Sequence, residues 1–306
     1  MDQPDPQANA DPTRFGIGEF TALPGTESRV HVAVAEPDTV NVGLVTGTRG
    51  AVLIDTGSTP DQGAELRRRA EDVAGVPVVG AVVTHAHHDH WFGLAAFDDV
   101  DTWGHDSLTE PPDQALLARA AELGLDPSQI RPPSRPLSIA AAVDLDGVRL
   151  EMLYLGPGHS GSDVMVLVHL GDSMRPQVVF AGDVIESAPG SDESVWYGTD
   201  SHPAEWGGSL DALTGLLTDT VQVVPGHGPS VDKEFVLDQR SRIMSIPFET
   251  ERLINDGIAF EQARDKGQWM LPWANIEAGV RIGYAELEAR GVVPRTRLPL
   301  TEADLD

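Results

Sequence analysis

The chain has 306 residues, of which 41% are hydrophobic, so it is long enough to bury one large core or two small ones. Its 48 acidic residues outnumber 21 basic ones and give a net charge of −27, which argues against a nuclease or any other nucleic-acid partner, because such a surface repels phosphate backbones. Cysteine is absent, which excludes disulfides and thiol chemistry and fits a reducing compartment.

The N-terminal segment, residues 1–15, is rich in Pro, Asp, Gln and Asn and has little to bury, so we predict that it is disordered. It has neither the basic stretch nor the apolar stretch of a secretory signal. No apolar run in the chain approaches the length that spans a bilayer. We therefore expect a cytoplasmic protein that has no membrane partner.

Next along the chain, alternating apolar residues predict strands at 30–35 and 40–45. A further apolar run ends in Asp55-Thr-Gly57, where the glycine favours a turn. The spacing of residues 61–73 predicts an amphipathic helix, and a strand follows at 78–83.

This strand runs into the densest motif of the chain, Thr84-His-Ala-His-His-Asp-His90, although the whole chain has only 10 histidines. Imidazole and carboxylate are ligands of Zn²⁺ and other divalent metals. His85 and His87 are two residues apart, so at the end of a strand they point the same way. Asp89 and His90 follow where the chain must turn. One segment can therefore supply ligands to two adjacent metal ions.

Three further potential ligands each stand alone in a glycine-containing loop after an apolar run: His159, Asp183 and His227. Glycine lets the backbone turn sharply and approach a bound ion. Strands predicted at 148–154, 164–169, 176–181 and 221–224 deliver or support these loops. Helices are predicted at 114–123 and at 206–218, and the leucines of the second are core residues.

These motifs resemble the metallo-β-lactamase superfamily, with its His-x-His-x-Asp-His motif and a later His, Asp and His. The resemblance covers residues 16–231 and implies an α/β fold, the αββα sandwich, with metal loops at strand ends. Residues 232–306 lie beyond it and are predicted as a helical C-terminal extension, with helices at 234–252 and 275–290. Whether this extension packs on the sandwich, closes the pocket or joins two copies into a homo-oligomer stays open.

The resemblance also implies a site for two divalent metal ions, expected to be Zn²⁺, although the same ligands accept Fe or Mn. The implied ligands are His85, His87 and His159 for the first ion, Asp89, His90 and His227 for the second, and Asp183 as the bridge between them. Asp55, which matches the superfamily's first motif, would orient a ligand imidazole and raise its basicity. His31, His105, His169 and His202 are expected to be structural. His88 lies at a position that the family pattern leaves free, and it is expected either to support a ligand from outside or simply to be packed.

The activity that the resemblance implies is a dinuclear metal-dependent hydrolase. A water held between two cations has a lowered pKa, and the resulting metal-bridging hydroxide would attack a small ester, thioester, lactone or amide. Asp89 would pass a proton to the leaving group as the catalytic acid. The alternative is an iron-dependent persulfide dioxygenase, which keeps the motif but binds one iron at the positions of His85, His159 and Asp183.

Substrate contacts are harder to predict. Four aromatic residues are candidates for an apolar substrate pocket, although aromatic side chains are more often core residues: Trp91, Phe92, Trp196 and Tyr197. The polar loop 186–202 is predicted to contact the substrate. The segment 106–138, which carries a proline-rich stretch, is expected to border the mouth of the site.

Overall fold

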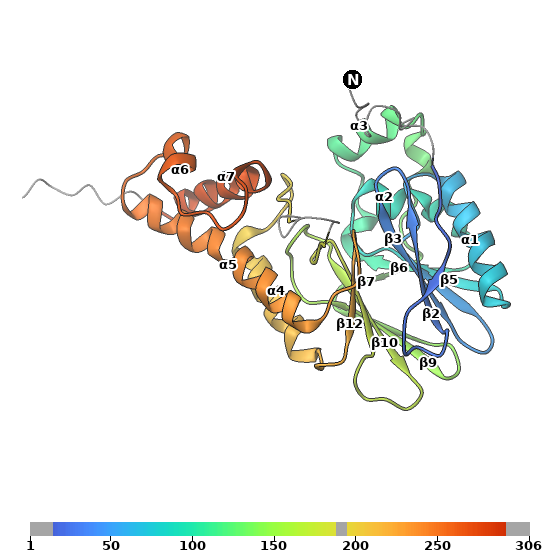
Figure 1. Ribbon diagram of the computed structural model, residues 1–306. Helices are drawn as coiled ribbons and strands as arrows, with labels where there is room; N and C mark the ends of the chain where they lie inside the picture. The colour runs from blue at the N-terminus through green and yellow to red at the C-terminus, as the bar shows by residue number, and fades with distance from the viewer. Residues whose placement is uncertain (1–14, 188–194, 292–306) are drawn as a thin grey trace, which may run out of the picture.

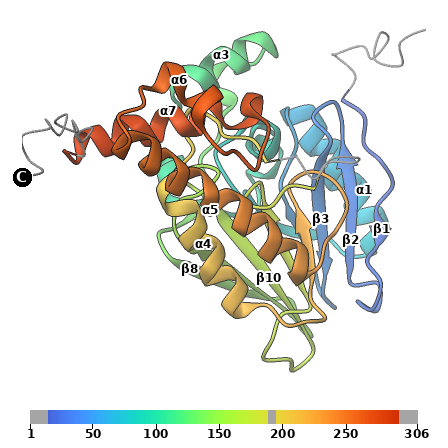
Figure 2. The same ribbon diagram turned by 60° about the vertical axis from the view of Figure 1, so that its left-hand side comes forward.

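The computed structural model describes residues 15–187 and 195–291, and their strands form two β-sheets that pack face to face. The prediction of disorder falls on residues 1–15, of which 1–14 lie outside the described residues. Helices cover the outer face of each sheet, with α1 on one side and α4 and α5 on the other (Figures 1 and 2). This is the predicted αββα sandwich.

The first sheet has seven strands in sequence order, joined by antiparallel pairs up to β4 and by parallel pairs from β4 to β7. Its strands are β1 (Thr21–Ala22), β2 (Val30–Ala35), β3 (Val40–Thr46), β4 (Ala51–Ile54), β5 (Val78–Val82), β6 (Asp101–His105) and β7 (Arg135–Leu137).

The second sheet has five strands in the order β12-β11-β10-β9-β8, and only β11 and β12 run parallel. Its strands are β8 (Ala140–Asp144), β9 (Val148–Tyr154), β10 (Val164–Leu170), β11 (Val178–Gly182) and β12 (Gln222–Pro225).

The helices are α1 (Pro60–Ala74), α2 (His88–Trp91), α3 (Gln114–Glu122), α4 (Pro203–Leu216), α5 (Lys233–Asn255), α6 (Phe260–Lys266) and α7 (Trp273–Ala289). Short 3₁₀ helices lie at η1 (Phe92–Phe97), η2 (Asp106–Thr109) and η3 (Pro127–Gln129). In the described part of the chain, no helix combines the length and apolar character needed to cross a bilayer.

Helix α1 shows how local sequence sets the limits of an element. The Thr59 side chain accepts a hydrogen bond from the backbone of Gln62 and caps the N-terminus, and Pro60 follows at the first helical position. Gly75 ends the helix in the left-handed conformation with φ 67°, which glycine adopts without steric cost. The predicted helix 61–73 is thus confirmed with one extra residue at each end.

The period-two alternation of strand residues builds the layers. In β4, Val52 and Ile54 face the second sheet, whereas Leu53 faces the α1 side. In β10, Val166 belongs to the core between the sheets and Met165 to the core beneath the helices. Both strands are buried on both faces, which is why they read as continuous apolar runs.

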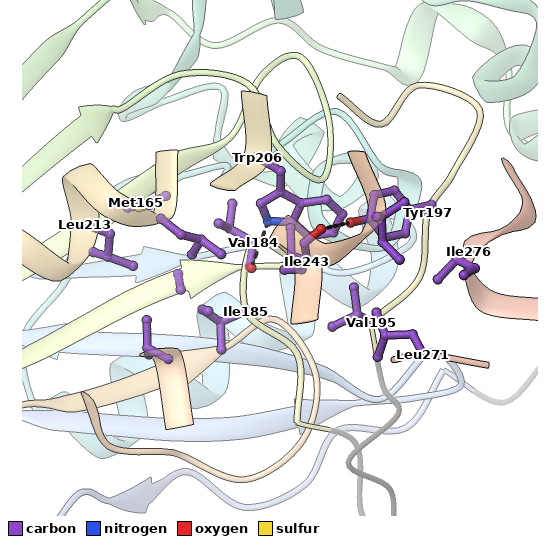
Figure 3. Packing of buried hydrophobic residues seen from close by; sticks show 14 of the residues in the cluster. Met165, Val184, Ile185, Val195, Tyr197, Trp206, Leu213, Ile243, Leu271 and Ile276 are labelled. Carbon is purple, nitrogen blue, oxygen red and sulfur yellow. Dashed lines mark hydrogen bonds between the residues drawn. The ribbon is translucent and has the colours of Figure 1, made fainter. Parts of the chain in front are cut away.

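The C-terminal extension packs on the sandwich. Ile243 of α5 and Ile276 of α7 belong to the same buried cluster as Met165 of the second sheet and Trp206 of α4 (Figure 3). Figure 3 also shows the Trp206 indole donating to the backbone oxygen of Val184, at 3.2 Å. The extension therefore shares one hydrophobic core with the second sheet and reaches the loop that follows β11.

Four strands and two short α-helices have no counterpart among the predicted elements: β1, β6, β7, β8, α2 and α6. Strand β8 is a run of alanines with mostly exposed positions, β7 is three residues with a proline, and β6 lacks a regular apolar alternation. Alanine and proline are poor strand formers in isolation. These strands form because a neighbouring strand offers an edge whose backbone N–H and C=O groups are still unpaired. That pairing depends on the tertiary fold and cannot be predicted from the local sequence.

Candidate metal centre

The predicted ligands come together where strands of both sheets end. His85 follows β5, Asp183 follows β11 and His227 follows β12, and these strands belong to parallel pairs whose carboxyl ends share an edge. A bridge between Val40 and His227 joins the two sheets at this point. The site is therefore built from the ends of buried strands, with His159 added from the loop after β9.

The structure brings all seven predicted ligands into two adjacent groups. Within each group, one possible ligand atom of every residue lies within 4.8 Å of the others. The first group is His85, His87, His159 and Asp183, and the second is Asp89, His90 and His227. Two separate groupings of imidazole and carboxylate fit two separate divalent cations. That each residue binds a metal remains a prediction.

Asp183 lies between the groups. Its Oδ1 is 3.3 Å from His90 Nε2, and its Oδ2 is 3.4 Å from both His159 Nε2 and His227 Nε2. A Cβ atom at Gly226 would collide with Asp183 Oδ1, so only glycine allows this approach. The carboxylate thus contacts imidazoles of both groups, as a bridging ligand requires.

Several ligand atoms are buried and unpaired. His85 Nε2, His90 Nε2 and Asp183 Oδ1 have no hydrogen-bond partner among the residues that the structure describes. Leaving a buried polar atom without a partner costs about 1–3 kcal/mol, more for a charged group. Bound cations would satisfy all three atoms at once, so the donor set fits the metal ions that the motifs predict.

The imidazoles are held by partners on their far sides. Asp55 Oδ2 lies 2.8 Å from His90 Nδ1, and its carboxylate also accepts from the backbone N–H and the hydroxyl of Thr84. Because the Thr84 hydroxyl donates to Asp55, its oxygen is left to accept from His85 Nδ1, 3.0 Å away. Both rings therefore turn Nε2 toward the metal groups. This geometry agrees with the orienting role predicted for Asp55.

Two further carboxylates were not singled out by the sequence. Asp200 Oδ2 lies 3.0 Å from His87 Nε2, which leaves His87 Nδ1 facing His159 Nε2 at 3.1 Å. Glu186 Oε1 lies 3.7 Å from His159 Nδ1. Both belong to the loop 186–202, which was predicted to contact the substrate; its residues 188–194 lie outside the described residues. The loop was recognisable by its polar composition, but no local signal marked these two positions.

The Glu186 backbone is fixed by the C-terminal extension. Gln239 of α5 donates from Nε2 to the Glu186 carbonyl at 2.6 Å and accepts from the Glu186 N–H at 3.1 Å. Burial, reinforced by the Asp183 charge, raises the pKa of Glu186 well above its usual value. The extension thus positions a buried acid beside the first group.

Electrostatics differ between the two groups when no ion is bound. Burial lowers the pKa of His159 to about 4 and, with the neighbouring His90, holds the pKa of His85 well below its ordinary value. Burial also disfavours protonation of His227, but the Asp183 charge outweighs it and raises the pKa of His227 to about 9. His90 is likewise buried, yet Asp183, Asp55 and Asp89 together raise its pKa. His87 is the exception in the first group, since burial disfavours its protonation but Asp200 outweighs it and raises its pKa. In the second group, both imidazoles have raised pKa values.

Three of the four aromatic candidates for the substrate pocket are buried in the structure. Trp91 and Phe92 are 2% and 1% exposed and pack in the core on the α1 side, because α2 and η1 turn them away from the ligands. Tyr197 is buried against Trp206, with ring centroids 4.9 Å apart (Figure 3). The burial of these side chains argues against the predicted pocket role. Trp196 is 54% exposed, and its backbone contacts the Glu186 carboxylate, so its contact with a substrate stays a prediction.

The segment predicted to border the mouth of the site contacts the neighbouring elements. The Trp91 indole donates to the backbone oxygen of Arg131 at 2.7 Å, and Arg119 of α3 lies 3.7 Å from Asp38. Asp38 belongs to the turn between β2 and β3, and it faces His88 of the motif. These contacts place the segment beside the motif helix α2, while its contact with a substrate remains a prediction.

Comparisons with known proteins agree with this geometry. The family model of the metallo-β-lactamase superfamily matches residues 35–227. A metallo-β-lactamase type 2 of Bacillus sp. (strain 170) is 26% identical over 196 residues, which cover 64% of this chain and 69% of the relative. The acyl-coenzyme A thioesterase MBLAC2 of Homo sapiens is 29% identical over 217 residues, which cover 61% of this chain and 72% of the relative.

Solved structures share the fold. A metallo-β-lactamase from Pseudomonas aeruginosa in a mono-zinc form has a TM-score of 0.56 and 22% identity, covering 77% of this chain and 97% of its own. A metallo-β-lactamase from Hirschia baltica has a TM-score of 0.52 and 23% identity, covering 74% and 97%. Because the family model spans more than half of the sequence, the chain belongs to the metallo-β-lactamase superfamily.

Proposed function

We propose that this protein is a hydrolase that uses two divalent cations, expected to be Zn²⁺, to cleave a small ester, thioester, lactone or amide. The observation that carries the proposal is the position of Asp183, whose carboxylate oxygens lie 3.3–3.6 Å from imidazole nitrogens of both ligand groups. A single carboxylate shared by two ligand groups is the arrangement that a dinuclear centre needs.

Two cations held there would lower the pKa of a bound water and polarise the substrate carbonyl. The protein's own contribution is orientation: Asp55 fixes the His90 ring and Thr84 fixes the His85 ring. Asp89 Oδ2 lies 3.5 Å from His90 Nε2 and from His227 Nε2, so this oxygen faces the second group. From that position Asp89 is proposed to hold the proton that leaves with the departing group.

The named activities of the relatives support this range of substrates. One relative is called a thioesterase and others are called β-lactamases, so thioester and amide cleavage both occur on related sequences. The acidic composition and the carboxylates Glu186 and Asp200 beside the first group support a small-molecule substrate rather than a nucleic acid.

A hydrolysis screen tests the proposal. The purified protein is stripped with a chelator, reloaded with Zn²⁺, Mn²⁺ or Fe²⁺, and assayed on matched esters, thioesters, lactones and amides. We expect turnover that disappears on stripping and returns with the metal, and that is absent in His90→Ala. Turnover that survives complete metal removal would contradict the proposal.

The iron-dependent dioxygenase alternative needs only one ion. The second group, Asp89, His90 and His227, is assembled as fully as the first, and its buried His90 Nε2 has no hydrogen-bond partner in the described part of the chain. A single iron would leave that atom unsatisfied, which favours the hydrolase. Oxygen uptake with a persulfide, without hydrolysis of any substrate class, would instead support the dioxygenase.

A further inference from the structure

One histidine of the motif has no role in the proposed centre. His88 stands between His87 and Asp89 and is the first residue of α2. Its two ring nitrogens face two different carboxylates: Nδ1 lies 3.3 Å from Asp89 Oδ1, and Nε2 lies 3.4 Å from Asp38 Oδ2. His88 therefore links the predicted metal ligand Asp89 to a residue of the β2–β3 turn.

The two oxygens of Asp89 face different neighbours. Oδ2 faces the second ligand group, 3.5 Å from the Nε2 atoms of His90 and His227, whereas Oδ1 faces His88. A carboxylate can rotate about its last torsion, which is broad and roughly twofold. A donor that holds Oδ1 therefore decides which oxygen is presented to the second group.

The His88 ring is itself held in place. It packs edge-on against Phe92, with ring centroids 6.0 Å apart and planes at 70°, and Phe92 is a buried core residue. His88 Nε2 is buried and makes no hydrogen bond of good geometry with any described residue. The Asp38 carboxylate at 3.4 Å is the acceptor that faces this atom.

Asp38 is anchored in turn. Its Oδ2 accepts a hydrogen bond from the Ser58 hydroxyl at 2.9 Å, and its Oδ1 lies 3.7 Å from Arg119 of α3. A continuous series of contacts then runs from Asp89 through His88 and Asp38 to Arg119. His88 and Asp89 are neighbours in α2, whereas Asp38 and Arg119 come from two other parts of the chain. Neighbourhood in sequence therefore does not explain the contacts that Asp38 makes with His88 and Arg119.

We propose that His88 is a positioning residue that fixes Asp89 for the second metal ion, and that Asp38 holds His88 in the required orientation. The inference rests on the proposed dinuclear centre and adds to it two residues that touch neither ion. Outer partners of metal ligands change metal affinity by about 10–100-fold when they are removed. We expect an effect of this size on the second ion and none on the first.

Two substitutions separate the two contacts of the ring. In His88→Asn the amide nitrogen replaces Nδ1 and can still donate to Asp89, while the contact with Asp38 is lost. In His88→Gln the amide nitrogen replaces Nε2, so the Asp38 contact is kept and the Asp89 contact is lost. Co²⁺ titration of metal-free protein, followed by its visible absorption bands, measures the affinity of each ion without any substrate.

We expect His88→Gln to weaken the second Co²⁺ by about 10–100-fold and to change its absorption spectrum, with the first ion unchanged. His88→Asn should stay within a few-fold of the wild type. Asp38→Asn should weaken the second ion less than His88→Gln does. Thermal unfolding of each metal-free variant checks that it folds.

The matched control is His169, a buried residue whose Nε2 lies 3.0 Å from the half-buried Glu151 in a pair that belongs to neither ligand group. His169→Gln should leave both Co²⁺ affinities unchanged. Equal losses in His88→Asn and His88→Gln, or wild-type affinity in His88→Gln, would overturn the positioning role while the wild type still binds two ions. A wild type that binds a single ion would overturn both this role and the dinuclear centre.

Discussion

The two ligand groups of the candidate centre are anchored in different ways. In the second group, His90 is fully buried and its partner Asp55 is 2% exposed, so their contact lies inside the sandwich. In the first group, His87 and its partner Asp200 are 29% and 43% exposed, and Asp200 comes from a loop. The second ion would therefore be held by ligands that are anchored inside the sandwich, whereas the first ion would depend partly on the polar loop after β11.

Substitution of Asp183, which contacts both ligand groups, should have the largest effect on metal affinity. Asp183→Asn removes the charge that contacts both groups, so both ions should be lost, with a decrease in affinity beyond the ~10–100-fold expected for an outer partner. Co²⁺ titration measures both affinities. Glu151→Gln, which changes a carboxylate paired with His169 outside the centre, is the matched control. Loss of one ion only would show that Asp183 does not bridge.

The second-largest effect should be that of pH, which should change the affinity for the second ion more than the affinity for the first. Metals bind the neutral imidazole, so protons held by His227, with a pKa of about 9, and by His90, whose pKa is also raised, must be displaced. The second ion should bind about 50-fold more weakly at pH 7 than at pH 9 from His227 alone, because half of this imidazole is still protonated at pH 9. The first ion should change less, because the pKa of His159 is about 4 and that of His85 is also lowered, which leaves His87 as the one imidazole of the first group with a raised pKa. Isothermal titration in buffers of different pH measures this; equal pH slopes would contradict it.

Substitution of Asp55, the buried partner of His90, should have the third-largest effect on metal affinity. Asp55→Asn keeps the shape of the side chain but weakens its acceptance from His90 and Thr84, so the second ion should bind about 10–100-fold more weakly. The first ion should be less affected. Unfolding of the metal-free variant should also occur at lower temperature, because a charge-assisted hydrogen bond inside the core is lost. Unchanged binding of the second ion would contradict the orienting role of Asp55.

The exposed anchor should have the smallest effect. Asp200→Asn should weaken the first ion by less than about 10-fold, because water can replace an exposed hydrogen-bond partner of His87. The second ion should not change. If Asp200→Asn weakened the first ion as much as Asp55→Asn weakens the second, the exposed and the buried partner would anchor their groups equally. That result would contradict the difference between the two groups.

The sequence predicted most of the ligand framework because metal chemistry restricts residue type and spacing. The motif 84–90 and the three glycine-flanked loops are short local signals, and the buried strands that carry them have a clear apolar pattern. Asp200 could not be found in this way, since it meets His87 across 113 residues and has no distinctive neighbours. Trp91 and Phe92 were assigned to the pocket because they follow the motif, but a helical turn directs them into the core.

The metal content of each chain tests the central claim most directly. Protein purified without added metal should contain two zinc-like ions per chain by elemental analysis, and Asp183→Asn should contain fewer than one. One iron per chain with little zinc would contradict the dinuclear hydrolase and favour the dioxygenase. Folded protein that binds no metal, even after incubation with Zn²⁺, would contradict the metal centre itself.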